Sequence, residues 1–560
     1  MLNHDKQIKI FLQQLLNHSI NEVVISPGSR STPLVKNILL NKKLFNLHLV
    51  LDERSAGYFA LGKSKISNKP TILVCTSGTA TLNYSPSIAE AFYSKIPLIV
   101  ITADRPMHYR DTASNQTLNQ NNIYSNNINW FYDIPITNEV NFVSNIAYKA
   151  VYLSNNAPKG PVHINWQFEE PFTDGDLQTL ISTPKESVTQ DKEFKLNSDE
   201  IDNLLPMVEN KNGLILVGSH SYDNNHIINL SKVINWPIIA DPLSNLRNSK
   251  NYKDNVIVDS GDLIYRTKNP KLTPDTIIHI GALPVSKFIC NNLENVKNHI
   301  FIEPSHRISH GFFNMSLHIN SPIKSIVKAI ENKISKRSNN KWKDYFKKIN
   351  VRTRLGIEKH LYGIKEISYK AKIIESLPKD SIFISGNSLP IRILDIVLNK
   401  SEDVKFLGNR GLSGIDGNIS IAAGISSSTS SPVFLDLGDL AFAHDIGGLI
   451  TAKRNAKNLT IFVNNNKGGQ IFNLLPQSKD LKDIYEKWFI TPHEKINISD
   501  LAKSFECNYF NPNNEKEIIE IVMKKLTKNI NIIELNLDKT DYTQYNSYIK
   551  KAIDSINFEE

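Results

Sequence analysis

An apolar run, a polar loop and a helical segment recur in that order four times within the first 105 residues. The apolar runs are residues 23–25, 47–51, 72–75 and 97–103, and residues 162–165 predict one further strand. Short runs of this kind, bounded by turn residues, are typical of strands buried on both faces of a parallel sheet. Because parallel neighbours need a crossover that is usually helical, the pattern predicts a doubly wound parallel α/β sheet.

Similar apolar runs recur in two later parts of the chain. They lie at residues 213–217, 237–240, 276–280 and 298–302, and again at 381–385, 432–437, 459–463 and 532–535. The polar stretch at 182–195 has the composition of a linker, and the stretch at 335–348 that of a linker followed by the start of a helix. Because 560 residues exceed what one hydrophobic core accommodates, we expect three doubly wound α/β domains, at residues 1–182, 197–333 and 345–560.

Composition excludes several classes of protein. The net charge of +9 comes from 65 basic and 56 acidic residues, and the lysines are scattered, which argues against nucleic acid binding and suits small anionic substrates. The three cysteines, Cys75, Cys290 and Cys507, form no close pair, which favours a reduced, cytoplasmic protein. No apolar run reaches the roughly 18 residues of a membrane span, and we expect no signal peptide.

Two apolar runs of the third predicted domain end in residues suited to a metal ion. Gly438 and Asp439 follow the first run, a helix is expected over about 441–452, and Asn466 and Gly468 follow the second run. Ligands of open α/β sheets bind at the carboxyl ends of the strands, and carboxylate, amide and carbonyl oxygens suit Mg²⁺. The alternative is that both motifs are turns without a ligand.

Loops of the first predicted domain also carry candidate ligand-binding residues. The loop at 26–33 is rich in glycine and hydroxyl groups and leads into a helix, which indicates either an anion site or simple helix capping. Glu53 follows the second strand and is a candidate ligand-binding acid. Alternatively, its carboxylate only stabilises the N-terminus of the helix that follows. Gly57 and Gly62 follow Glu53 and predict close packing against another helix.

Together these motifs resemble those of the thiamine diphosphate-dependent carboligases and decarboxylases, which have two outer α/β domains and a third between them. The match is closest to the menaquinone-pathway synthases of 2-succinyl-5-enolpyruvyl-6-hydroxy-3-cyclohexene-1-carboxylate, in which Gly-Asp-Leu, here ending at Leu440, is an accepted metal motif. The segments that resemble this family are residues 25–34, 52–54, 76–80, 102–106, 115–116 and 409–417. The resemblance covers both outer domains in order and the middle domain only loosely.

The resemblance implies thiamine diphosphate and Mg²⁺, or Mn²⁺, as cofactors. Asp439, Asn466 and the Gly468 carbonyl would hold the metal, and Glu53 would face the aminopyrimidine ring. Ile415 would hold the cofactor in a bent conformation; alternatively, Ile415 is an ordinary core residue. The implied cofactor-binding residues are Glu53, Asn115, Ile415, Gly438, Asp439, Leu440, Asn466, Gly468, Ile471, Phe472 and Leu475, the last three forming an apolar wall.

The family also implies two substrates that each carry two carboxylates, 2-oxoglutarate and isochorismate. The first would be decarboxylated, and its succinyl unit would add 1,4 to the second. By motif position Ser29, Arg30, Gln116 and Lys287 would hold isochorismate, and Ser388 and Arg392, spaced by one helical turn, would hold the distal carboxylate of 2-oxoglutarate. The predicted catalytic set is Glu53, Ser29, Arg30, Arg105, Gln116, Lys287, Ser388, Arg392 and Arg410.

Arginine can hold a carboxylate through two parallel hydrogen bonds, although any single arginine can instead form a surface ion pair. One position departs from the family pattern, because Phe288 follows Lys287 where some relatives have an arginine. Alternative functions are another thiamine diphosphate enzyme, such as an acetolactate synthase or a 2-oxo acid decarboxylase, and a non-catalytic binding protein. The intact Glu53, Asp439 and Asn466 argue against the binding protein.

The resemblance assigns roles to the outer domains and implies an oligomer. Residues 1–182 would bind the pyrimidine of the cofactor, and residues 345–560 would bind its diphosphate and the metal. In this family the two kinds of domain meet across subunits, so we expect a homodimer or a homotetramer.

Overall fold

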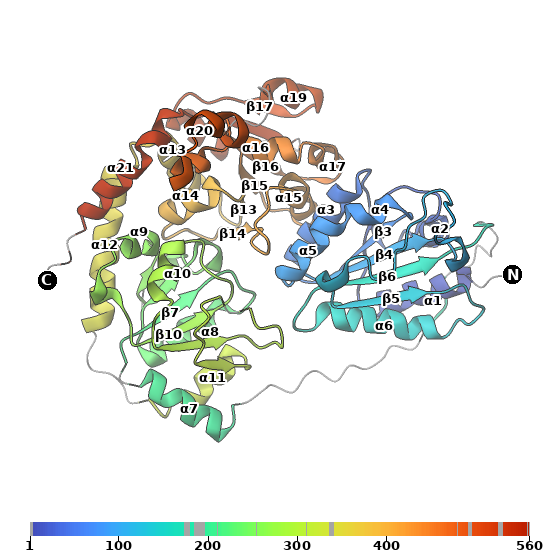
Figure 1. Ribbon diagram of the computed structural model, residues 1–560, viewed down its shortest axis with the longest axis horizontal. Helices are drawn as coiled ribbons and strands as arrows, with labels where there is room; N and C mark the ends of the chain where they lie inside the picture. Colours follow the sequence, from blue (N-terminus) through green and yellow to red (C-terminus); the bar gives the residue numbers. More distant parts are fainter. Residues whose placement is uncertain are drawn as a thin grey trace.

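The computed structural model describes residues 4–172, 180–183, 196–209, 211–253, 255–309, 311–334, 341–478, 480–490, 496–524, 530–556 and 558. Within these ranges the chain forms three six-stranded sheets in which all strand pairs are parallel. The predicted fold class is therefore confirmed. In Figure 1 the first sheet (blue) lies at the right, the second (green) at the lower left, and the third above the second, next to both. Every helix in the described ranges is too short or too polar to cross a bilayer.

The first sheet has the strand order β2-β1-β3-β4-β6-β5. Its strands are β1 (Glu22–Ile25), β2 (Asn46–Leu49), β3 (Thr71–Cys75), β4 (Leu98–Asp104), β5 (Trp130–Ile134) and β6 (Pro161–Gln167). Its helices are α1 (His4–Asn17), α2 (Thr32–Leu40), α3 (Glu53–Ser67), α4 (Thr79–Asn83), α5 (Ser85–Tyr93) and α6 (Phe142–Asn155). All four predicted runs form strands, and β3 and β4 are buried along their whole length.

The second sheet has the strand order β12-β11-β10-β7-β8-β9. Its strands are β7 (Gly213–Val217), β8 (Ile238–Ala240), β9 (Ile257–Val258), β10 (Thr276–Ile280), β11 (Asn298–Ile302) and β12 (Leu317–Ile319). Its helices are α7 (Ser198–Val208), α8 (Asn224–Ile234), α9 (Gly261–Arg266), α10 (Lys287–Leu293) and α11 (Ile323–Ile330). The polar stretch predicted as a linker before this sheet lies mostly outside the described residues.

The third sheet has the strand order β14-β13-β15-β16-β18-β17. Its strands are β13 (Ile382–Ser385), β14 (Lys405–Gly408), β15 (Val433–Gly438), β16 (Leu459–Asn465), β17 (Asn508–Phe510) and β18 (Asn531–Asn536). The helices of this part are α12 (Lys341–Leu361), α13 (Lys365–Ser376), α14 (Leu389–Val397), α15 (Asn418–Ser427), α16 (Asp439–His444), α17 (Gly448–Asn455), α18 (Lys482–Tyr485), α19 (Ile498–Ser504), α20 (Glu515–Met523) and α21 (Thr540–Asp554).

The segment between β15 and β16 forms the two helices α16 and α17, so the prediction of one helix over 441–452 is wrong. The helix is interrupted after His444, at Asp445. The buried carboxylate of Asp445 accepts hydrogen bonds from the backbone nitrogen of Ser420 at 2.9 Å and from the hydroxyl of Ser420 at 3.3 Å. Because this side chain turns inward to the start of α15, the first helix ends there.

Helices α3 and α15 join the first and third parts of the chain by close backbone packing (Figure 1). A Cβ atom on Gly62 would lie 2.3 Å from the backbone oxygen of Ile421, and one on Gly424 would lie 2.1 Å from that of Phe59. Only glycine permits such an approach. The prediction that the glycines of this helix allow close packing is confirmed.

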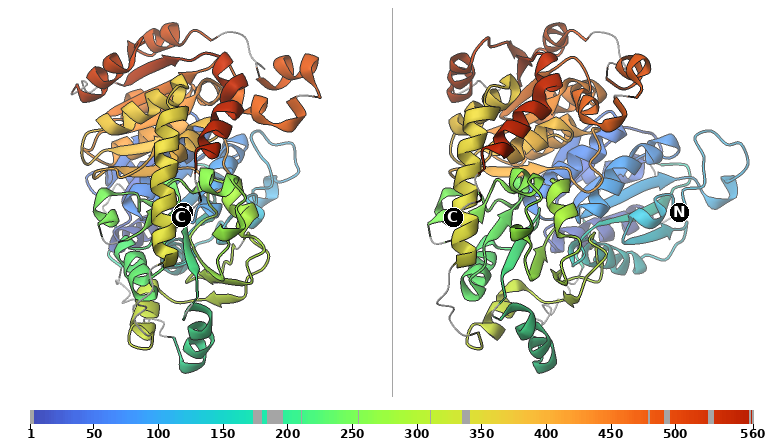
Figure 2. Two further views of the ribbon diagram at one scale, coloured as in Figure 1. Left: turned by 90° about the vertical axis from the view of Figure 1, so that its left-hand side faces the viewer. Right: turned by 60° about the vertical axis from the view of Figure 1, so that its left-hand side comes forward.

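Helix α12 connects the second and third parts and belongs to the cores of both. Phe346 and Ile349, in its first half, pack into a cluster with the second sheet, whereas Ile357 and Leu361, in its second half, pack with α13, α14 and α21. Figure 2 shows this helix, in yellow, running along both parts. It begins at Lys341, so the prediction that a helix starts within residues 335–348 is confirmed.

Candidate active site

The carboxyl ends of β15 and β16 bring the two halves of the predicted metal motif together. The strands pair in parallel, with Gly438 opposite Asn464. Asp439 follows as the first residue of α16 and is buried. Its Oδ2 accepts a hydrogen bond from the backbone nitrogen of Gly468 at 2.7 Å, and its Oδ1 accepts one from that of Leu440 at 2.8 Å. The carboxylate is thereby fixed against the second half of the motif.

The side chain of Asn466 presents an oxygen at the same place. Its Nδ2 donates to the hydroxyl of Tyr542 at 3.1 Å, whereas its Oδ1 is buried and has no hydrogen-bond partner among the described residues. A buried amide oxygen is costly to leave unpaired. With Asp439 and the Gly468 carbonyl it forms a set of hard oxygen donors that fits Mg²⁺. Among the described residues, no cluster of three or more histidine, cysteine or acidic side chains offers another metal centre.

Buried ionisable groups lie behind this edge of the sheet. The hydroxyl of Tyr542 donates to Glu366 on α13, and burial raises the pKa of Glu366 to about 7. Lys370, one turn further along α13, forms an ion pair with Asp436 of β15, and neither side chain is exposed. Because buried charges need partners, these contacts tie α13, β15 and α21 to the metal motif.

Glu53 is the first residue of α3, after the carboxyl end of β2. The helix cap is the preceding Asp52, whose side chain accepts hydrogen bonds from the backbone nitrogens of Arg54 at 2.8 Å and Ser55 at 3.4 Å. Capping therefore does not require Glu53. Burial raises the pKa of Glu53, an effect that hydrogen bonds, including one with Asn83, oppose. A raised pKa makes the carboxyl group easier to protonate, as an acid that exchanges a proton requires.

Arg54 links the helix that begins with Glu53 to the helix that begins with Asp439. Its Nη2 donates to the backbone oxygen of His444 at 3.2 Å and lies 3.9 Å from Asp445. His444 is the last residue of α16. Within one chain, therefore, the helix of the metal motif ends against the N-terminal turn of α3.

Ile415 lies in a loop that is held from two sides. The Nδ2 atom of Asn387 donates to the backbone oxygen of Gly414 at 2.7 Å, and Glu90 of α5 accepts from the backbone nitrogen of Gly411 at 2.9 Å. Ile415 itself is 38% exposed in the single chain. It is therefore not a plain core residue, and an apolar side chain is presented on a fixed loop.

The loops of the first sheet bring Arg105 and Gln116 together. One nitrogen of Arg105, Nη1, donates to the hydroxyl of Ser77 at 2.8 Å and to the backbone oxygen of Gln116 at 2.7 Å. Gln116 has a φ of +56° and donates from Nε2 to the backbone oxygen of Ser77 at 3.3 Å. The predicted polar residues that follow β3 and β4 thus form one cluster.

Arg30 belongs to the same edge of the first sheet. Its Nη1 donates to the backbone oxygen of Phe168 at 3.0 Å, and its guanidinium lies 4.7 Å from the ring centroid of Phe172. Burial and the positive charge of Arg105 lower the pKa of Arg30. The adjacent Ser29 is exposed. Two guanidinium groups whose positive charges repel each other are suited to binding an anion.

A second group of cations lies where the third sheet meets the middle part. Arg392 of α14 donates from Nη1 to the backbone oxygen of Ser388 at 2.6 Å, and Arg410 donates from Nη1 to Oδ1 of Asn387 at 2.9 Å. Ser388 precedes α14 rather than sharing its face, and its φ is +74°. The pKa of Arg392 is lowered by burial first, then by Arg410 and, more weakly, by Arg266.

Lys287 belongs to this second group, at the first position of α10. Its Nζ lies 5.5 Å from the ring centroid of Phe288, and the guanidinium of Arg266 lies 4.1 Å from the same centroid. The Nε atom of Arg266 donates to Asp262 at 2.7 Å. The sequence prediction missed Arg266, because an Asp and an Arg four positions apart on a helix usually form a surface pair.

The predicted cations Arg30, Arg105, Lys287, Arg392 and Arg410 therefore form two groups within one chain. The hydrogen bonds of Arg30 and Arg105 stay within the first part, and those of Arg392 and Arg410 stay within the third. The remaining predicted residues are exposed or partly buried: Asn115, Gly438, Leu440, Ile471, Phe472 and Leu475.

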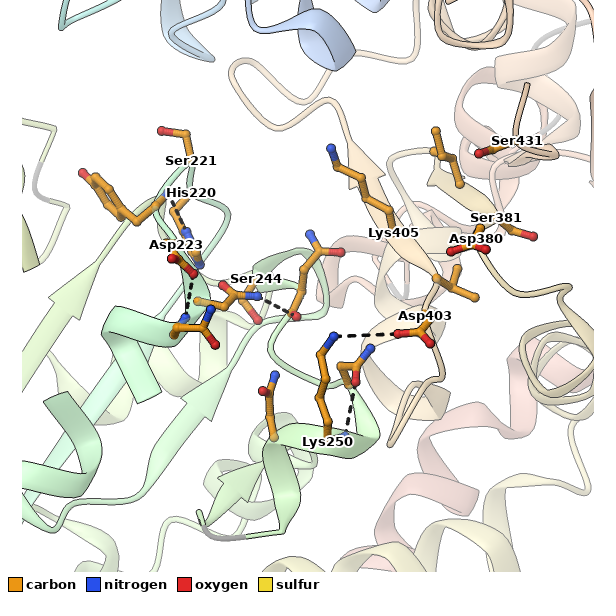
Figure 3. A pocket seen from close by; sticks show the side chains of 18 residues that line it. His220, Ser221, Asp223, Ser244, Lys250, Asp380, Ser381, Asp403, Lys405 and Ser431 are labelled. Atoms are coloured by element: carbon orange, nitrogen blue, oxygen red, sulfur yellow. Dashed lines mark hydrogen bonds and ion pairs between the residues drawn. The ribbon is translucent and has the colours of Figure 1, made fainter. Parts of the chain in front are cut away.

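A separate cleft of about 760 Å³ lies between the second and third sheets (Figure 3). Charges of both signs line it, and Lys250 pairs with Asp403 across it at 3.8 Å. The lining contains none of the predicted site residues. With its mixed charges it offers no selective binding surface for a dianion.

Comparison with known families identifies the class of protein. The N-terminal TPP binding domain of the thiamine pyrophosphate enzymes matches residues 6–123, and the C-terminal TPP binding domain of these enzymes matches residues 396–534. The first match contains Glu53 and the second contains the metal motif. The three parallel sheets and this pair of domains define a thiamine diphosphate-dependent enzyme.

Relatives that align over nearly the whole chain narrow this class. The 2-succinyl-5-enolpyruvyl-6-hydroxy-3-cyclohexene-1-carboxylate synthase of Bacillus pumilus is 32% identical over 552 residues, covering 94% of this chain and 93% of its own. That of Staphylococcus epidermidis is 33% identical over 567 residues, covering 98% of each chain, and that of Listeria monocytogenes is 32% identical over 569 residues, covering 96% of each. The chain belongs to the 2-succinyl-5-enolpyruvyl-6-hydroxy-3-cyclohexene-1-carboxylate synthase family.

Proposed function

We propose that the chain catalyses the thiamine diphosphate- and Mg²⁺-dependent decarboxylation of 2-oxoglutarate and the 1,4-addition of the succinyl unit to isochorismate. The product is the compound for which the related synthases are named, and the reaction belongs to menaquinone biosynthesis. The observation that carries the proposal is the unpartnered Oδ1 of Asn466 beside the fixed carboxylate of Asp439. Few protein oxygens, with positions left for phosphate oxygens, are typical of magnesium bound to a diphosphate.

The proposed cofactor roles divide between the outer domains. Bound thiamine diphosphate supplies the carbon nucleophile and electron sink for removing carbon dioxide from a 2-oxo acid. In domain 345–560, Asp439, Asn466 and the Gly468 carbonyl hold Mg²⁺, or Mn²⁺ in its place. In domain 1–182, Glu53 holds a proton on its carboxyl oxygen and exchanges it with the pyrimidine ring. Apolar side chains exclude water from the cofactor: Ile415, Ile471, Phe472 and Leu475.

The two groups of cations suit two substrates with two carboxylates each. The group of the first domain, with Ser29, Arg30, Arg105 and Gln116, holds isochorismate. Arg392 and Arg410 hold the distal carboxylate of 2-oxoglutarate, with the backbone of Ser388 at the start of the same helix. Lys287 lies beside the ring of Phe288, as does Arg266, and by its motif position we assign it to isochorismate.

We infer that the active enzyme is a cytoplasmic homodimer, or a homotetramer built from dimers. Apolar side chains around the proposed site are exposed in the single chain, among them Leu51 at 68%, Ile450 at 51% and Leu82 at 45%. Leu51 lies two residues before Glu53. A second copy that covers these side chains would remove them from water and enclose the cofactor.

The deciding experiment is mass spectrometry of the products formed from 2-oxoglutarate and isochorismate with thiamine diphosphate and Mg²⁺. We expect the succinylated cyclohexene carboxylate and equimolar carbon dioxide. Pyruvate in place of 2-oxoglutarate is the control for an acetolactate synthase or a small 2-oxo acid decarboxylase. Turnover of pyruvate at a comparable rate, or no product that contains isochorismate, would overturn the proposal. Light scattering of the active protein tests the oligomer, and a fully active monomer would contradict it.

A further inference from the structure

Two hydrogen bonds determine which end of the Asn466 side chain faces the proposed metal. Nδ2 of Asn466 donates to the hydroxyl oxygen of Tyr542 at 3.1 Å, and that hydroxyl donates to Oε2 of Glu366. A side-chain amide has a donor end and an acceptor end of nearly the same shape. Its orientation is therefore determined by its partners and not by packing.

We propose that Tyr542 and Glu366 are positioning residues of the metal site, which hold the amide nitrogen of Asn466 and leave its oxygen for the cation. The hydroxyl of Tyr542 donates its single proton to Glu366. Above pH 7 Glu366 is mostly ionised, and an ionised carboxylate only accepts hydrogen bonds. The oxygen of Tyr542 then offers only lone pairs to Asn466 and selects its nitrogen. The inference rests on the proposed function, because it assumes that Asn466 binds Mg²⁺.

Burial and backbone contacts make this chain of residues specific. Glu366, Tyr542 and Asn466 are 1%, 2% and 4% exposed and come from α13, α21 and the loop after β16. Water therefore has little access to replace a lost partner. The backbone oxygen of Asn466 accepts separately from Nε2 of Gln470 at 3.0 Å. A variant of Tyr542 should thus change the amide orientation and leave the loop in place.

The first test replaces Tyr542 by phenylalanine and measures the Mg²⁺ concentration that gives half-maximal thiamine diphosphate binding by calorimetry at pH 8, without substrates. We expect an increase of about tenfold, the lower end of the effect typical for partners of metal ligands. Tyr369→Phe is the matched control, because it removes a buried hydroxyl on α13 that donates to the backbone oxygen of Asn513 at 3.0 Å, away from the site. Its Mg²⁺ dependence should equal that of the unmodified protein.

Two variants of Glu366 test the direction of the hydrogen bonds. Glu366→Gln keeps an oxygen that accepts from Tyr542, so the Mg²⁺ dependence should change by less than about threefold. Glu366→Leu frees the hydroxyl proton of Tyr542 to donate to the amide oxygen of Asn466 and turn its nitrogen toward the metal. We expect this variant to be impaired at least as much as Tyr542→Phe. This pair of variants decides the question if Tyr542→Phe does not fold.

A double variant tests orientation itself. A carboxylate has two equivalent oxygens, so in Asn466→Asp either orientation of the side chain presents an oxygen to the metal. Adding Tyr542→Phe to Asn466→Asp should therefore change the Mg²⁺ dependence by less than about threefold. Equal effects of Tyr542→Phe in both backgrounds would overturn the positioning role. If neither Tyr542→Phe nor Asp439→Ala changes the Mg²⁺ dependence, the metal site of the proposed function is wrong. If Asp439→Ala changes the Mg²⁺ dependence and Tyr542→Phe does not, only the positioning role is wrong.

Discussion

The guanidinium of Arg266 lies 4.1 Å from the ring centroid of Phe288, and its Nε donates to Asp262 at 2.7 Å. Phe288 stands where some members of the family have an arginine after the lysine that corresponds to Lys287. A guanidinium is therefore present at this face of the middle domain, but it comes from α9. Its charge contributes to the lowered pKa of Arg392, so these two guanidinium groups of the second group share one electrostatic environment.

We expect Arg266→Gln to raise the KM for 2-oxoglutarate about tenfold, because a charge is lost beside the proposed site of the distal carboxylate. Steady-state kinetics with saturating isochorismate measure this effect. Arg454→Gln, at an exposed position of α17, is the control and should leave KM unchanged. An unchanged KM for Arg266→Gln would mean that Arg266 only packs against Phe288.

Variants of Arg392 and Arg30 should separate the two substrates. Arg392→Ala should weaken 2-oxoglutarate binding and slow the release of carbon dioxide in a single turnover without isochorismate. Arg30→Ala should leave that step nearly unchanged and weaken isochorismate. Loss of a charge-assisted carboxylate contact costs about 1.5–3 kcal/mol, or roughly ten- to a hundredfold in the affected constant. Equal slowing of carbon dioxide release by both variants would contradict the division into two groups.

Glu53→Gln should lower turnover by roughly 10²- to 10⁴-fold, the range for loss of a general acid–base group. The amide keeps the shape of the side chain, so thiamine diphosphate binding measured by calorimetry should stay within about threefold. Asp439→Ala should have the opposite pattern, because it removes one of few metal ligands and the cofactor is lost. A near-normal rate for Glu53→Gln would exclude Glu53 from proton exchange.

Asp445 gives the protein a stability that depends on pH. Its ordinary pKa is 3.8, and burial raises it to about 6 in the folded chain. Because the raised pKa makes the folded state bind this proton more tightly than the unfolded state, protonated Asp445 adds to the free energy of unfolding. This stabilisation is fully present below pH 4 and is lost as the pH rises through 6. Relative to the unmodified protein, Asp445→Asn should therefore gain about 2 kcal/mol between pH 4.5 and 7.5.

Thermal or urea unfolding at the two pH values measures this difference. Asp500→Asn, at an exposed position in α19, is the matched control and should follow the unmodified protein at both. A constant difference between Asp445→Asn and the unmodified protein would show that the carboxylate is ionised throughout this range.

The strands that sequence reasoning missed share one property, their place at the edge of a sheet. They are β5, β9, β12, β14 and β17. An edge strand has one neighbour and is less buried, as in β5, where four of five residues are half-buried and Asp133 interrupts the apolar run. Central strands such as β3 and β4 are buried on both faces and carry continuous apolar runs. The sequence pattern thus predicts sheet centres better than sheet borders.

The same distinction applies to the candidate site. Asp439 and Asn466 were predictable because each follows a buried strand, and parallel strands end at one edge. Glu366 and Tyr542 were not predictable, because their burial and mutual hydrogen bond arise where α13 meets α21. Nothing in the local sequence of α13, which reads Lys365-Glu366-Ile367-Ser368, distinguishes a buried glutamate from a solvated one.

Helix α12 has a mechanical consequence for the proposed site. Its two halves are buried in different cores, through Phe346 on one side and Ile357 on the other. The middle and third parts cannot swing apart without breaking the helix or exposing one of these side chains to water. The middle part is therefore a fixed wall and not a hinged lid, and the fold itself sets how Arg266 on α9 lies relative to Arg392 on α14.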